Sequence, residues 1–262
     1  MKAKFLVVSL SMIFVFCGCN LSSVRKNTGS WGDWTDSIPP QPKEEYLKFI
    51  DDLKSPLWTK HDWLAAPPAL NHIDVKKGIT LYKNFPDSKG LLATAYDDLE
   101  TFLRAGDIPV NRNHFVIETA HRPDLDKESF IIETDSFCCK ISSGDTEGIR
   151  RGIFYLEDQM LSVKGPFLKI GTFKKTTDIR RRISRCAFGP IKRLPLMRDE
   201  LMDTVNYYPD NYLNRLAHEG VNGLWLTVEF KDLVSSPYLV DGGKNAEKRL
   251  KKLSDVVNSC LR

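Results

Sequence analysis

Cysteine and histidine are among the residue types that could hold a metal ion or supply a nucleophile. The chain has six cysteines and five histidines. They show no CxxC or HExxH spacing, so the sequence predicts no zinc site and no other cofactor. Cys138 and Cys139 lie in a predicted strand, where neighbouring side chains point to opposite faces. We therefore expect no disulfide between them.

Adjacent carboxylates could supply a general acid and a general base. Asp51 with Asp52, and Asp97 with Asp98, are such pairs, and both lie on predicted helices. Neighbouring side chains on a helix point about 100° apart, so each pair is typical of a solvated helix face. The sequence therefore predicts no catalytic role for either pair.

The N-terminus predicts export. Lys2 and Lys4 precede an apolar run that is shorter than the ~20 residues needed to span a bilayer, so residues 1–18 are interpreted as a signal peptide. The run ends in residues 16–19 (FCGC), which resemble a bacterial lipobox. This resemblance implies that Cys19 is lipidated and that the protein is anchored in the cell envelope, in the outer membrane or facing the periplasm. The alternative is an ordinary secretory signal, with Cys19 a spare thiol.

Composition places the chain among globular proteins. Its 262 residues are 42% hydrophobic and 27% charged, and 38 Lys+Arg against 34 Asp+Glu leave a net charge of +4. At about 150 residues per domain, this length suggests two domains. The small positive excess is spread along the chain, which predicts neither a nucleic-acid partner nor a polybasic membrane patch.

Residues 19–71 form a region rich in Ser, Asn, Gly, Trp and Pro, which predicts a tether followed by an arm that wraps a folded domain. Four of the five tryptophans lie here: Trp31, Trp34, Trp58 and Trp63. We expect them to anchor the arm, because a large ring can fix a segment that lacks regular structure. A sugar-stacking platform is the alternative.

Regular patterns follow over residues 72–177 and predict a two-layer α+β domain. Strands are predicted at 78–82, 115–118, 130–133 and 138–142, with a hairpin between the last two, and helices at 90–103 and 146–161. Asp145 is the expected N-cap of the second helix. Gly148 and Gly152 share one face of this helix, which lets its backbone approach a sheet closely.

Residues 178–262 predict the start of an α/β, TIM-barrel-like segment. A strand at 182–188, a helix at 212–218, an apolar strand at 220–229 and a helix at 245–261 alternate along the chain. A nearly continuous apolar strand is typical of a parallel sheet covered on both faces. The 84 residues from Ile179 onward accommodate two strand-helix units of a barrel that takes ~250 residues, so the sequence predicts an incomplete barrel.

Residues 141–156 (ISSGDTEGIRRGIFYL) resemble the sheet-to-helix segment of the small α+β domain that precedes the barrel in family 20 glycoside hydrolases, the β-N-acetylhexosaminidases. A similar domain precedes the barrel in the family 67 and 115 α-glucuronidases. The resemblance covers residues 72–262 at the superfamily level. It implies the N-terminal part of a divergent glycoside hydrolase that acts on an oligosaccharide or glycan.

The same resemblance implies one substrate-binding residue, and a position at a strand end indicates a second candidate. Residues 178–185 (DIRRRISR) look like the first barrel strand, on which hexosaminidases carry an Arg that holds sugar hydroxyls, and Arg185 matches that position. A planar fork of donors suits vicinal hydroxyls. Glu229 ends the second strand, within residues 225–229 (WLTVE), where the sequence departs from the family's His-Trp-His-like stretch. Its place at the strand's end makes it a candidate site residue. The alternatives are an ion-paired Arg185 in a basic run and an ordinary loop carboxylate at Glu229.

Two departures from the family pattern separate the hypotheses on function. The Asp that usually shares the first strand is absent, and the family's Asp-Glu catalytic pair belongs to a fourth strand, beyond Arg262. The sequence therefore predicts an exported glycoside hydrolase portion that holds no catalytic residue of its own and has no activity alone. The alternative is a non-catalytic surface lipoprotein that binds a glycan or a protein partner.

Overall fold

The computed structural model describes residues 43–64, 67–111, 114–185, 200–226, 228, 233–235, 237–238 and 242–261. All of them belong to one unit, Pro40–Arg262. The predicted signal peptide, Cys19, Trp31, Trp34 and Glu229 lie outside the described residues. Within the described ranges no helix combines the length and the apolar character that crossing a membrane requires.

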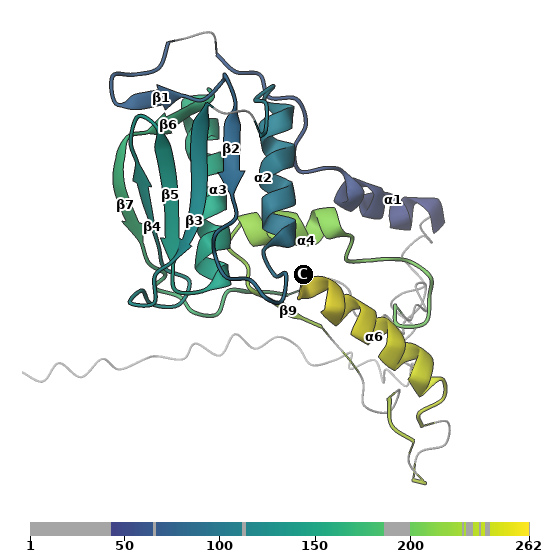
Figure 1. Ribbon diagram of the computed structural model, residues 1–262. Coiled ribbons are helices and arrows are strands. Elements are labelled where there is room, and N and C mark those ends of the chain that lie inside the picture. The colour runs from purple at the N-terminus through teal and green to yellow at the C-terminus, as the bar shows by residue number, and fades with distance from the viewer. Residues whose placement is uncertain are drawn as a thin grey trace, which may run out of the picture. The chain divides into compact units, whose positions relative to one another are not determined.

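A five-stranded mixed sheet is the centre of the fold (Figure 1). Its strand order is β2 (Ile79–Tyr82), β3 (Phe115–His121), β5 (Cys138–Ser143), β4 (Phe130–Thr134) and β7 (Gly171–Lys175). β2, β3 and β5 are parallel, whereas β4 is antiparallel to both β5 and β7. The predicted hairpin of β4 and β5 is confirmed. Cys138 and Cys139 are separate thiols, as expected.

Two helices, α2 (Ala93–Ala105) and α3 (Thr146–Val163), complete this layer and bury its apolar residues. α3 packs along β4 and β5, and α2 packs beside α3. Phe102, Ile141 and Ile153 are fully buried in the shared core. We call the five strands with α2 and α3 the sheet layer; its mixed α and β content agrees with the predicted α+β class.

Local chemistry explains where α3 begins and how closely it packs. Asp145 is its N-cap and accepts a hydrogen bond from the Gly148 N–H at 2.8 Å. A Cβ atom at Gly148 would lie 2.5 Å from the Ser129 carbonyl oxygen, and one at Gly152 would lie 2.4 Å from Ile141 Cγ2. Both glycines therefore let the helix approach the sheet, which confirms the prediction.

The arm residues that the structure describes pack on this layer. Residues of the arm form α1 (Lys43–Lys54). Further along, Trp58 Nε1 donates to Asp98 at 3.0 Å and Trp63 Nε1 donates to the Gly106 carbonyl at 2.7 Å. Both rings pack against the main core, so the anchoring role is confirmed for these two tryptophans. A small antiparallel pair, β1 (His72–Asp74) with β6 (Phe167–Lys169), was not predicted.

The second half forms a β-α-β unit. β8 (Ile183–Arg185) pairs in parallel with β9 (Gly223–Trp225), and α4 (Asp210–His218) lies between them in the chain. A last helix, α6 (Ala246–Cys260), follows. We call the first three elements the β8–α4–β9 unit. One such unit is compatible with an α/β segment, and the barrel itself stays a prediction.

The expected coverage of the second strand on both faces is not found among the described residues. Leu224 and Leu226 pack against a small core formed with α1, α4 and the Tyr207–Tyr208 segment. Trp225, which lies between them, is 62% exposed, and Ile183 on β8 is 56% exposed. The pleat therefore separates a covered face from an uncovered one.

Candidate functional site

The candidate substrate site is the edge at which β8 and β9 end. Arg185 is in register with Trp225, and both are the last residues of their strands. Because parallel strands run in one direction, their carboxyl ends meet at the same edge of the sheet, where α/β proteins bind ligands. The structure thus pairs a predicted site residue with an exposed tryptophan that sequence reasoning had not assigned to the site. The Arg185 side chain is not among the described atoms.

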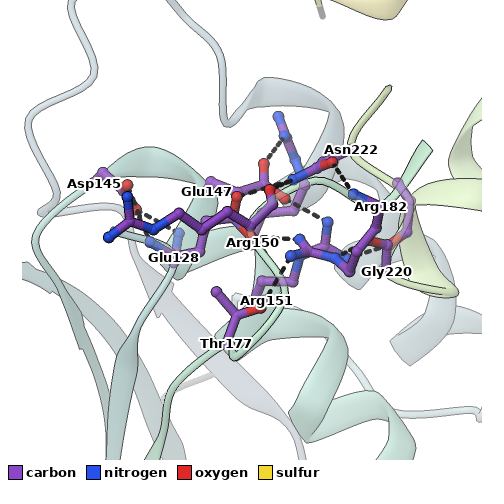
Figure 2. Close-up of polar contacts among 12 residues, drawn as sticks. Glu128, Asp145, Glu147, Arg150, Arg151, Thr177, Arg182, Gly220 and Asn222 are labelled. Carbon is purple, nitrogen blue, oxygen red and sulfur yellow. Dashed lines mark hydrogen bonds and ion pairs between the residues drawn. The ribbon is translucent and has the colours of Figure 1, made fainter. Parts of the chain in front are cut away.

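The opposite end of the same strands is held by Arg182, the residue before β8 (Figure 2). Its guanidinium forms an ion pair with Glu128 and donates to the Gly220 carbonyl. Nη1 also donates to Thr177 Oγ1 at 3.0 Å. Arg182 therefore ties the segment that enters β8 to the sheet layer and to the end of α4.

Asn222, the residue before β9, completes this junction. The Arg182 N–H donates to Asn222 Oδ1, and the Asn222 N–H donates to the Arg182 carbonyl, both at 2.9 Å. Asn222 Nδ2 also donates to Glu128 Oε1 at 3.0 Å. The amino ends of both strands are thus fixed to one carboxylate.

Glu128 is itself positioned by the start of α3. Its backbone has a positive φ of 61°, and its N–H donates to the two oxygens of Asp145 at 3.2 and 3.1 Å. Asp145 therefore caps α3 and orients the loop that presents Glu128, as Figure 2 shows.

A second set of contacts holds α4 to α3. Glu147 Oε1 and Oε2 each form an ion pair at 2.6 Å, with Arg151 and Arg150 respectively. Arg151 Nη1 reaches across to the Ala217 carbonyl of α4 at 2.5 Å. Burial lowers the pKa of Arg151, and the charge of the neighbouring Glu147 carboxylate partly offsets this by raising the same pKa. Its charge is thus compensated within the interface.

Asp98 of α2, Glu157 of α3 and His218 of α4 meet in a buried group that we call the acid–histidine cluster. His218 Nε2 lies 2.6 Å from Asp98 Oδ2 and 3.6 Å from Glu157 Oε2. Asp98 Oδ1 also accepts from Asn214 Nδ2 at 2.6 Å. The prediction that Asp97 and Asp98 are both solvated is wrong for Asp98. Packing of α4 against α2 buries this side chain, whereas Asp97 is exposed.

Glu157 is the unusual member of the cluster. Its side chain is 0% exposed, and neither carboxylate oxygen has a hydrogen-bond partner. Burial, and then the charge of Asp98, raise the pKa of Glu157 well above its ordinary value. The three atoms of Asp98, Glu157 and His218 that could bind a metal ion lie within 4.8 Å of one another. Among the described residues, this group is the one that could hold such an ion.

A cavity of about 670 Å³ lies beside this cluster. Asp98, Trp58 and Asn214 line it, together with Arg150 and residues at the start of β9. The cavity therefore gives the acid–histidine cluster a path to solvent. Its lining includes Gly223 and Leu224 at the amino end of β9.

Sequence patterns offered a single signal for this cluster. Asp98 and His218 are 120 residues apart, and each stands in an ordinary amphipathic helix. Glu157 lies on the helix face that the periodicity assigns to the core, and a buried carboxylate at such a position was the one available signal.

Comparisons with solved structures place the chain beside glycoside hydrolases. A family GH138 enzyme targeting pectin rhamnogalacturonan II has a TM-score of 0.54 and 18% identity over 70% of this chain. A GH20 exo β-N-acetylglucosaminidase from Vibrio harveyi has a TM-score of 0.41 and 16% identity over 69%. A family GH115 4-O-methyl-α-glucuronidase has a TM-score of 0.43 and 11% identity over 68%. The first likeness supports a glycoside-hydrolase-like fold and does not single out family 20.

The chain spans about a quarter of these structures, covering 23%, 28% and 28% of their respective lengths. The sequence matches no protein-family model, and no curated protein is similar to it.

Proposed function

We propose that this chain forms the small α+β domain and the opening part of the substrate-binding domain of a glycoside hydrolase. Its role is to hold a sugar of a glycan substrate at the ends of β8 and β9. The observation that carries this proposal is the register of Arg185 with the exposed Trp225 at the carboxyl edge of a parallel strand pair.

The two side chains complement each other chemically. A guanidinium donates to vicinal hydroxyls, and an indole offers a flat apolar face to the C–H side of a sugar ring. The Arg182 and Asn222 junction supports this role, because it fixes the opposite end of both strands to the sheet layer. Glu229, four residues after Trp225, is the proposed second polar contact.

Hydrolysis of a glycosidic bond needs a carboxylic acid that protonates the leaving oxygen. We propose that this acid is supplied from outside the present chain, because the described carboxylates near β8 and β9 are engaged in structural contacts. Glu128 and Glu147 are ion-paired, and Glu157 is buried away from the Arg185 edge. In this proposal the protein is exported and anchored to the envelope through a lipid on Cys19.

Sugar binding tests the proposal directly. The chain should bind one or more members of an oligosaccharide panel that includes pectin-derived, N-acetylhexosamine and glucuronic acid sugars, as measured by calorimetry. Arg185→Ala and Trp225→Ala should each weaken binding about tenfold or more, whereas Arg181→Ala, two residues before β8 begins, should not. Binding that survives both site substitutions would favour the surface-lipoprotein alternative.

Turnover is the second test. Residues 20–262 should release no aryl group from aryl glycosides of N-acetylhexosamine, glucuronic acid or neutral sugars. Measurable turnover abolished by Glu229→Gln would place a catalytic carboxylate within the chain and contradict the proposal.

Metabolic labelling tests the lipid anchor. A fatty-acid probe should mark the wild type and not Cys19→Ala, and equal labelling would exclude the lipid anchor.

A further inference from the structure

We propose that Asp98, Glu157 and His218 bind a zinc ion that fastens α4 to α2 and α3. This site is independent of the proposed sugar-binding edge. Its ligands come from three helices and include one imidazole nitrogen and two carboxylates, which are ligand types that zinc accepts in proteins.

The positions of the three ligand atoms fit such an ion. Zinc lies about 2.0–2.2 Å from nitrogen and oxygen ligands, so neighbouring ligands in a tetrahedral shell are about 3.3 Å apart. In the cluster, His218 Nε2 lies 3.6 Å from Glu157 Oε2 and 2.6 Å from Asp98 Oδ2. All three ligand atoms lie within 4.8 Å of one another, so side-chain shifts on the order of 1 Å would bring them into that shell.

Glu157 is the observation that points most directly to a ligand. Its carboxylate is fully buried and faces His218, yet neither oxygen receives a hydrogen bond. Buried polar groups are nearly always satisfied, because leaving one without a partner is costly. A dication bound between Glu157 and Asp98 would satisfy both carboxylates at once.

The surroundings of the cluster orient two of the ligands. Trp58 Nε1 and Asn214 Nδ2 donate to Asp98 Oδ1, at 3.0 and 2.6 Å, which leaves Oδ2 directed at His218. The His218 ring stacks on Phe154 with ring centroids 3.7 Å apart. Outer contacts that fix the orientation of metal ligands in this way are typical of metal sites.

An ion could enter from the cavity. Asp98, Trp58 and Asn214 line that cavity, so solvent reaches the cluster from the side of Asp98. Water from the same side can supply the fourth ligand of a tetrahedral zinc.

Zinc titration of the chelator-treated full chain tests the proposal. Calorimetry should show one zinc per chain, and saturating zinc should raise the melting temperature by about 3 °C or more. Glu157→Gln and Asp98→Asn keep the shape of the side chains and should weaken zinc binding about tenfold or more. Asp97→Asn, the exposed neighbour on α2, is the matched control and should bind zinc like the wild type.

X-ray absorption of the zinc-loaded wild type identifies the zinc ligands without any substitution. This measurement therefore tests the proposal even if a variant fails to fold. It should show one imidazole and oxygen ligands. A sulfur ligand, fewer than one zinc per chain, or equal zinc binding by Glu157→Gln would overturn the proposal. The last result would indicate that a proton on Glu157, and not a metal ion, compensates the cluster. Sugar binding at the Arg185 edge is read separately, so failure of one proposal leaves the other intact.

Discussion

The sheet layer and the β8–α4–β9 unit are held together in different ways. In the sheet layer, α3 alone contributes eight buried residues, whereas α4 and α6 contribute none. The unit depends instead on directional contacts, chiefly those of Arg182, Asn222 and His218. We therefore expect apolar burial to stabilise the sheet layer and polar contacts to dock the unit onto it.

The largest expected effect is on the free energy of unfolding, which should depend more on the core of the sheet layer than on the smaller core around Tyr207 and Tyr208. Phe102→Ala empties a fully buried position of the sheet layer and should lower the free energy of unfolding by about 3–5 kcal/mol. Leu213→Ala removes a partly buried residue of the smaller core and should cost about 1 kcal/mol or less. Urea denaturation measures both. Equal losses would show that the two regions are stabilised alike.

Close packing of α3 gives the next effect. Gly148→Leu places side-chain atoms where a Cβ would already lie 2.5 Å from the Ser129 carbonyl oxygen, so we expect a loss of about 1–3 kcal/mol in unfolding free energy. Ala93→Leu, at an exposed position of α2, is the control and should change stability little. A Gly148→Leu variant as stable as the control would disprove the close approach.

Loss of Arg182 should make local opening of the β8–α4–β9 unit easier and leave the sheet layer unchanged. Arg182→Ala removes an ion pair and several hydrogen bonds, and we expect local opening to become easier by about 1.5 kcal/mol. Hydrogen exchange should accelerate at the amides of β8, β9 and α4 and stay unchanged in β3 and β5. Arg181→Ala, an exposed neighbour, should leave exchange unaltered. Faster exchange throughout the chain would contradict separate stabilisation.

The smallest effect concerns a turn of the sheet layer. Asp135 accepts hydrogen bonds from the N–H groups of Phe137 and Cys138, which lower its pKa. Its stabilising contribution is therefore present above the ordinary Asp pKa and is lost as the pH falls through the lower folded value. The urea midpoints of the wild type and Asp135→Ala should differ at neutral pH and converge in acid. A difference that persists unchanged in acid would contradict this assignment.

Contacts between residues near each other in sequence were open to prediction. The Asp145 cap, the close approach of Gly148 and Gly152 and the β4–β5 hairpin depend on local periodicity and on turn chemistry, so composition and spacing indicate them. The short strands β1 and β6 were missed because three residues carry no periodic signal. β7 was missed as well, because it is an edge strand without buried residues. Trp58 and Trp63 were assigned correctly as anchors, since large rings in an irregular segment need a surface to cover them.

The sequence by itself indicated four of the five strands of the sheet layer, its two helices to within a few residues, and the order of strands and helices that follows. These features depend on short-range patterns of apolar residues, caps and glycines. Only the tertiary structure decided that Arg182 and Asn222 share Glu128, that Arg185 ends opposite Trp225, and that His218 meets Asp98 and Glu157. Each of these contacts joins residues 40 or more positions apart. Their partners are chosen by how whole elements pack, which no local pattern encodes.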